Sequence, residues 1–182
     1  MTHLGLATKA VGAVMAAALI GGCTATPTTS PTPTGPSQSP SPTVTPTPTL
    51  SPEDQKLEDA KARVVLLWQT LDGLLVDSSR SINELDTLAS GEALSSLQVM
   101  LTTVRQRGQV QVGATTIPSQ SALAKGEGWV VTSCVDRSEA ILTDKAGQPV
   151  TPAPQPRLSH ESTVQLVGAN LQITKDEVLG SC

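Results

Sequence analysis

The residues best suited to chemistry are few and lie far apart in the chain. Cysteines stand at positions 23, 134 and 182, and the two histidines are His3 and His160. A thiol can be acylated, oxidised or bound to a metal, and an imidazole can act as a base near neutral pH. The possible chemistry therefore rests on these positions and on the carboxylates that could assist them.

His160 lies in a predicted strand, with Glu161 on the opposite face. A serine–histidine–carboxylate site would need His160, but a half-exposed strand residue is the simpler interpretation. The sequence contains no nucleophile elbow, phosphate-binding loop or HExxH zinc motif. We therefore expect no catalytic residue, no cofactor and no metal site, and we expect that the protein is not an enzyme.

Two carboxylates, Asp136 and Glu139, flank Arg137 near a predicted strand end. Paired carboxylates can perform acid–base catalysis, but the arginine between them favours a solvated, charge-balanced turn. The glycines of the segment Lys125–Gly128 lack phosphate-binding spacing, and a hairpin turn explains them better.

The first 22 residues have the features of an export signal. Lys9 precedes an apolar run from Ala10 to Ile20. This run is shorter than the about 20 residues that a membrane-spanning helix needs, so it suits a cleavable signal peptide. Ile20–Cys23 resembles the bacterial lipobox. The resemblance implies cleavage before Cys23 and a diacylglyceryl group on its thiol, and two acyl chains anchor a protein stably. An ordinary signal peptide with an incidental cysteine is the alternative.

Residues 23–52 are expected to form a tether. From Thr24 to Pro52 the chain is almost entirely threonine, proline and serine, and it carries no charge. Such a segment cannot bury enough apolar surface to fold, and its prolines favour an extended conformation. O-glycosylation of this tether is a further hypothesis, and a bare spacer is the alternative.

Once Cys23 is assigned to the lipid, Cys134 and Cys182 remain. Outside the reducing cytosol, two remaining cysteines are expected to form a disulfide. A metal or redox pair is the alternative, but redox pairs usually lie close in sequence and one histidine cannot complete a zinc site.

Residues 53–182 are expected to form one α+β domain. Ser51 and Pro52 predict the start of a long helix that ends near Val76, and its apolar stripe includes Trp68. Two shorter helices follow, separated by Ser90–Gly91.

Beyond Gly108 the apolar period changes to two, which indicates strands. The expected strands cover 110–118, 129–135, 139–143, 158–167 and 171–174, with a loop at 151–156. Trp68 and Trp129 are expected in the core. The three helices should pack on one curved antiparallel sheet of about five strands.

This domain resembles the secreted actinobacterial lipoproteins with a cystatin-like, or nuclear-transport-factor-like, cone-shaped fold. The segments that carry the resemblance are Trp68–Asp72, Leu88–Gly91, Cys134–Asp136 and Gly180–Cys182. The resemblance implies a fold and a cellular address more than a chemistry.

Together these features predict an exported protein on the outer face of the cytoplasmic membrane, held there by lipidated Cys23. Its net charge of −4 argues against nucleic acid as a partner. We expect a non-enzymatic domain that binds an unknown surface protein or small ligand. One alternative is a phage-encoded lipoprotein acting in superinfection exclusion. Another is a small-ligand carrier or enzyme that uses the cone cavity.

Overall fold

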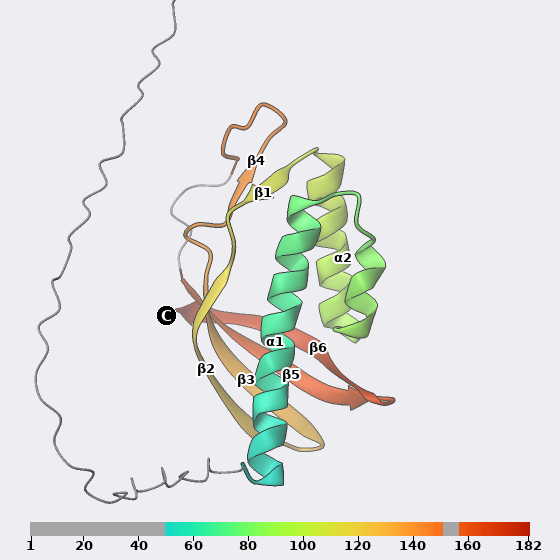
Figure 1. The fold of residues 1–182 in the computed structure, drawn as a ribbon, viewed down its shortest axis with the longest axis vertical. Coiled ribbons are helices and arrows are strands. Elements are labelled where there is room, and N and C mark those ends of the chain that lie inside the picture. The colour runs from blue at the N-terminus through green and yellow to red at the C-terminus, as the bar shows by residue number, and fades with distance from the viewer. Residues whose placement is uncertain (1–49, 151–156) are drawn as a thin grey trace, which may run out of the picture. The chain divides into compact units, whose positions relative to one another are not determined.

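The computed structural model describes residues 50–150 and 157–182, which all lie within the unit Pro46–Cys182. Its helices are α1 (Pro52–Val76), the 3₁₀ helix η1 (Ile82–Thr87) and α2 (Gly91–Gln106). Its strands are β1 (Val110–Val112), β2 (Thr116–Lys125), β3 (Gly128–Asp136), β4 (Ile141–Thr143), β5 (Leu158–Val167) and β6 (Asn170–Ser181). Helices precede and pack against antiparallel strands, so the α+β class predicted from the sequence is confirmed (Figure 1).

The long helix α1 begins where the sequence predicts. The Asp54 amide donates to Ser51 Oγ at 3.1 Å. Pro52 suits the first turn because amide groups there have no partner within the helix, and proline has no amide hydrogen. The helix buries one stripe of side chains against the sheet, namely Ala60, Val64, Leu67, Trp68, Leu71, Leu74 and Leu75. Helix α1 is therefore the main packing partner of the sheet, and its residues line one wall of any site between them.

The second predicted helix is a short 3₁₀ helix, η1, that starts after Ser81 and stops at Thr87. It stops because the chain then runs beside β6: the Ser90 amide donates to the Ile173 carbonyl, and the Ile173 amide donates to the Leu88 carbonyl, each at 2.9 Å. The predicted boundary at Ser90–Gly91 is confirmed, since α2 begins at Gly91.

The strands form two sheets rather than the single sheet expected. Four strands lie in the order β2-β3-β5-β6, every neighbouring pair antiparallel, and β1 pairs with β4 in a separate two-stranded sheet. Strand β3 is central, as its apolar sequence predicts. Gly113 separates β1 from β2 at a φ of 81°, and a Cβ there would meet the Glu139 carbonyl. This turn takes the chain from one sheet to the other.

The prediction that a strand ends at Ile117–Pro118 is wrong, because both residues lie within β2. The register between β2 and β3 shifts between Thr116 and Ser119, so the proline falls at an irregularity of an edge strand. An edge strand tolerates proline there, since a missing amide hydrogen leaves no ladder partner unpaired. Strand β6 is also longer than the predicted 171–174 and reaches Ser181.

Side chains from α1, η1, α2 and the four-stranded sheet form one hydrophobic core. The largest fully buried apolar side chains of this core are Leu74, Leu85, Leu101, Val64, Val131, Val135, Val164 and Ile173. Trp68 is 9% exposed and belongs to the core, as predicted, whereas Trp129 is only partly buried at its margin.

None of the helices in the described part of the chain is long and apolar enough to cross a membrane. The predicted signal peptide, Cys23, most of the tether and the predicted loop 151–156 lie outside the described residues.

Candidate binding site

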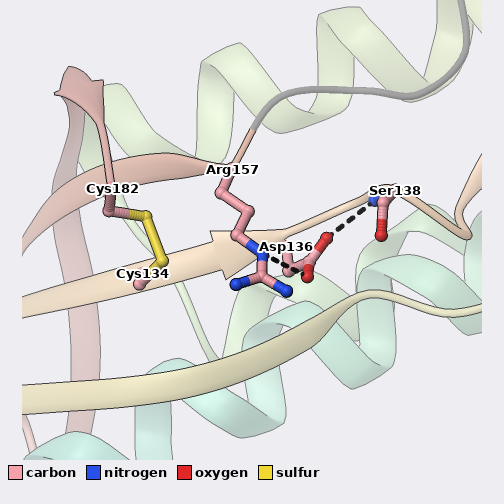
Figure 2. Close-up of a disulfide and its surroundings, with 5 residues drawn as sticks. All are labelled: Cys134, Asp136, Ser138, Arg157 and Cys182. Carbon is pink, nitrogen blue, oxygen red and sulfur yellow. Dashed lines mark hydrogen bonds and ion pairs between the residues drawn. A yellow bond between two sulfur atoms is a disulfide. The ribbon is translucent and has the colours of Figure 1, made fainter.

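Cys134 and Cys182 are joined by a disulfide, with a Cα–Cα distance of 5.8 Å (Figure 2). Cys134 lies on β3 and Cys182 follows the end of β6, so the bond links two strands that β5 separates. The pairing that the sequence favours over a metal or redox pair is thus present. Among the described residues no group of three or more histidine, cysteine, aspartate or glutamate side chains could hold a metal ion.

Asp136 lies beside this disulfide and differs from the solvated turn residue that the sequence suggests. It is 8% exposed, accepts from Arg157 Nε at 2.7 Å and accepts from the Ser138 amide at 2.9 Å (Figure 2). The hydroxyl and amide of Ser138, and to a lesser degree the Arg157 guanidinium, lower the pKa of Asp136 against the opposing effect of burial. Asp136 therefore closes a turn and takes no part with Glu139.

Arg137, expected to balance both carboxylates, instead donates from Nη2 to Gln111 Oε1 at 3.4 Å, and Glu139 is exposed. The turn that the sequence favours over a carboxylate pair is present, since Asp136 accepts from the Ser138 amide two residues on and Glu139 lies exposed beyond it. Asp136 is engaged by Ser138 and Arg157 rather than by Glu139.

His160 is buried at 7% exposure, so the expectation of a half-exposed residue is wrong. Its Nδ1 lies 2.8 Å from Asp176 Oδ2, and its ring meets Trp68 edge-on at a centroid distance of 5.2 Å. Ser162 Oγ donates to the other oxygen of Asp176 at 2.6 Å. The sequence could not reveal this cluster, because its members come from α1, β5 and β6.

The cluster does not have the arrangement of a nucleophilic site. There the serine hydroxyl donates to the imidazole, which removes its proton. Here Ser162 and His160 both turn to the same carboxylate, and Ser162 is fully buried. The interactions satisfy buried polar groups, as a structural role requires.

A second polar cluster fixes the start of β2. Asp72 on α1 accepts from Gln111 Nε2 at 2.7 Å and from the Thr115 amide and hydroxyl at 2.7 and 2.8 Å. Asp72 ends the Trp68–Asp72 segment that carries the family resemblance, but the sequence analysis assigned it no binding role, although an acid between buried Leu71 and Leu74 was a signal. These bonds tie the approach to β2 to the helix and so position the edge strand.

The surface between the first half of α1 and strand β2, here named the α1–β2 seam, carries two open grooves. Strand β2 is an edge of the four-stranded sheet, and α1 packs beside it (Figure 1). One groove, of about 430 Å³, is lined by Glu53, Lys56, Leu57, Ala124, Glu127 and Trp129. The other, of about 390 Å³, is lined by Glu58, Lys61, Val65, Ile117, Pro118 and Gln120.

The two grooves lie along one line. The α1 residues increase in number from the first groove to the second while the β2 residues decrease, so helix and strand run in opposite directions along the seam. Gln120 Nε2 joins the two walls by donating to the Lys61 carbonyl at 3.5 Å. The seam combines a strand edge, an aromatic side chain and charged groups, and it is the candidate binding site.

Comparison with known proteins identifies a fold only. No protein-family model matches the chain, and no curated protein matches it. The crystal structure of the intermembrane space region of chloroplast protein ARC6 is similar, with a TM-score of 0.57 and 18% sequence identity, over 74% of this chain and 100% of that chain. At this identity the likeness establishes a shared α+β fold.

Proposed function

We propose that the protein is an exported lipoprotein, anchored through Cys23 to the outer face of the cytoplasmic membrane, whose C-terminal domain binds a partner without catalysing a reaction. The lipobox-like residues Ile20–Cys23 after a short apolar run support the anchor. The partner is a surface protein or a small ligand.

The observation that carries the exported location is the Cys134–Cys182 disulfide. Structural disulfides persist in oxidising compartments and are rare where thioredoxin and glutathione keep thiols reduced. A disulfide in the domain and a lipid-attachment sequence before it are independent features that agree on one compartment.

The polar groups of the domain support binding rather than catalysis. His160, Ser162 and Asp176 satisfy one another, and Asp136 is held by Ser138 and Arg157. Apolar side chains fill the space between α1 and the sheet, which is where a cone-shaped fold would hold a small ligand. The open grooves of the α1–β2 seam therefore favour a partner that binds at the surface.

We further propose that the domain is a variant of the cystatin-like, cone-shaped fold of actinobacterial lipoproteins. Its long α1, packed across the antiparallel order β2-β3-β5-β6, supports this assignment. The domain differs from the expected single sheet in having a second, two-stranded sheet formed by β1 and β4.

Metabolic labelling tests the anchor. Cells expressing the full chain are grown with radioactive palmitate, and membrane and soluble fractions are compared for the wild type, Cys23→Ala and the control Thr28→Ala. We expect label and membrane location for the wild type and the control, and loss of both for Cys23→Ala. A Cys23→Ala protein that stays labelled in the membrane would contradict the proposal.

A further inference from the structure

The two edges of the four-stranded sheet differ at one point, because a neighbouring chain segment pairs with part of β6 and none pairs with β2 within the described residues. At the β6 edge, Leu88 and Ser90 make two backbone hydrogen bonds to Ile173, and Ala89 forms a parallel bridge with it. At the opposite edge, β2 (Thr116–Lys125) pairs with β3 on its inner side, and no strand of the described chain pairs with its outer side. Within the described residues the outward backbone amides and carbonyls of β2 thus have no strand partner, and an unpaired edge is a template for an added strand.

The sequence of β2 suits such pairing over its second half. Pro118 and the register shift that ends at Ser119 break the first part, while Ser119–Lys125 runs in unbroken register with β3. No residue from Thr116 to Ala124 is charged. Since edge strands are usually protected by charges, proline or bulges, Ser119–Ala124 is the unprotected stretch.

An added strand at this edge would lie along the α1–β2 seam and place alternate side chains toward its grooves. Backbone hydrogen bonds to a sheet edge give such complexes their affinity, and pockets for alternate side chains give them specificity. The two grooves lie at opposite ends of Ser119–Ala124. This spacing fits an extended peptide better than a compact ligand.

The charge of the first groove selects one kind of side chain. Glu53 and Glu127 line it together with the partly buried Trp129, against the single cation Lys56. Neither glutamate forms an ion pair within the described residues. A cation is attracted both to carboxylates and to the face of an indole ring.

We infer that the α1–β2 seam binds an extended peptide segment of a partner protein, added as a strand to β2, with a lysine or arginine side chain in the Trp129 groove. This inference deepens the proposed binding role and rests on it. The partner is recognised by an extended backbone and a positive charge.

Synthetic peptides test the inference directly. The probe is a fluorescein-labelled heptapeptide of alternating threonine and valine with lysine at its centre, and its match has glutamate there. Fluorescence anisotropy with the full chain in detergent gives both affinities. We expect the lysine peptide to bind at least about tenfold more tightly, the ratio expected from one cation beside an aromatic ring and carboxylates.

Charge reversal in the groove provides the second arm. Glu127→Lys should weaken the lysine peptide and remove the preference over the glutamate peptide. The control Glu92→Lys changes an exposed glutamate in the first turn of α2, and it should leave both affinities unchanged. Equal affinities for the two peptides in the wild type, or an unaltered preference in Glu127→Lys, would overturn the inference.

Backbone methylation provides the third arm. The lysine peptide is prepared with N-methyl groups on its threonines or on its valines, which removes alternate backbone donors without changing the side chains. Strand addition requires that one of the two forms fails to bind, and binding by both would contradict it. Concentration-dependent dimerisation of the chain that blocks peptide binding would show a second copy on β2 instead and would also overturn it.

These outcomes separate the inference from the proposed function. If Cys23 is labelled and the chain is anchored but no heptapeptide binds, the peptide inference fails alone. If Cys23 carries no lipid, the proposed function fails whatever the peptides do.

Discussion

The two edge strands of the four-stranded sheet, β6 and β2, differ in the contacts that hold them in place. Strand β6 is covered at Ile173 by the Leu88–Ser90 segment and tied to β5 through Asp176, while the disulfide fixes its end to β3. Strand β2 has none of these additional ties on its outer side within the described chain. The difference teaches that the two edge strands are fixed in different ways: the disulfide and Asp176 hold β6 to its sheet neighbours, whereas Asp72 and the Gln120–Lys61 bond hold β2 to helix α1.

Removal of the disulfide should have the largest effect. The bond joins residues separated by 48 positions, and the chain-entropy model gives about 4 kcal/mol for a loop of that size. We expect Cys134→Ala/Cys182→Ala to lose about that much free energy of unfolding, measured by urea unfolding of the full chain in detergent. Cys23→Ala is the control and should unfold as the wild type does. A loss of unfolding free energy below about 1 kcal/mol would show that the disulfide contributes little to the stability of the β6 edge.

Truncation of one apolar side chain on each edge strand should give a sharp contrast. Ile173 on β6 is 0% exposed, whereas Leu123 on β2 is 55% exposed. Because a cavity forms only where the side chain is buried, Ile173→Ala should cost about 3 kcal/mol and Leu123→Ala about 0.5 kcal/mol or less. Urea unfolding measures both. Similar losses for the two variants would contradict the assignment of β2 as the open edge.

Loss of the shared carboxylate should have an intermediate effect. Asp176→Ala leaves His160 Nδ1 and the Ser162 hydroxyl without their acceptor, and an unsatisfied buried polar group costs about 1–3 kcal/mol. We expect a loss of about 2 kcal/mol in urea unfolding. The control Glu177→Ala lies one residue further along β6 and removes only a surface pair with Lys175, so it should change stability by less than about 1 kcal/mol. Equal losses of stability for Asp176→Ala and Glu177→Ala would contradict a structural role for the His160–Ser162–Asp176 cluster.

The smallest expected effect is the contribution of ionised Asp136 to stability, which depends on pH. The pKa of Asp136 is lowered from the ordinary 3.8, mainly by Ser138, so its ionised form stabilises the fold above that pH. This contribution is lost as the pH falls below about 4 through the lowered pKa. The difference in urea midpoint between wild type and Asp136→Asn should therefore shrink on acidification from about pH 5 to about pH 2. Ser138→Ala should reproduce part of the effect, and a difference that does not change with pH would contradict it.

The sequence predicts those parts of the fold that depend on local signals. Helix α1 has a serine cap, a proline in its first turn and an apolar stripe, all within one segment. Strand β3 is rich in β-branched residues and is central. Strand β2 carries a weaker signal: serine and alanine make up much of its second half, Pro118 lies near its start, and its pairing with β3 defines it as a strand.

The candidate site was harder to predict than the fold. Trp129 could be named, but its place in a groove depends on where Glu53 and the β2–β3 hairpin meet in space. The burial of His160 likewise depends on Trp68 and Asp176, which come from other elements. Periodicity reports one element at a time, whereas these contacts arise between elements.

The intact mass of the protein purified from its membrane fraction tests the central claim most directly. The account predicts a chain that begins at Cys23, carries a diacylglyceryl group on that residue, and is two hydrogen masses lighter than the fully reduced form because Cys134 and Cys182 are bonded. A chain that begins at Met1, carries no lipid and has free thiols would contradict both the anchor and the exported location.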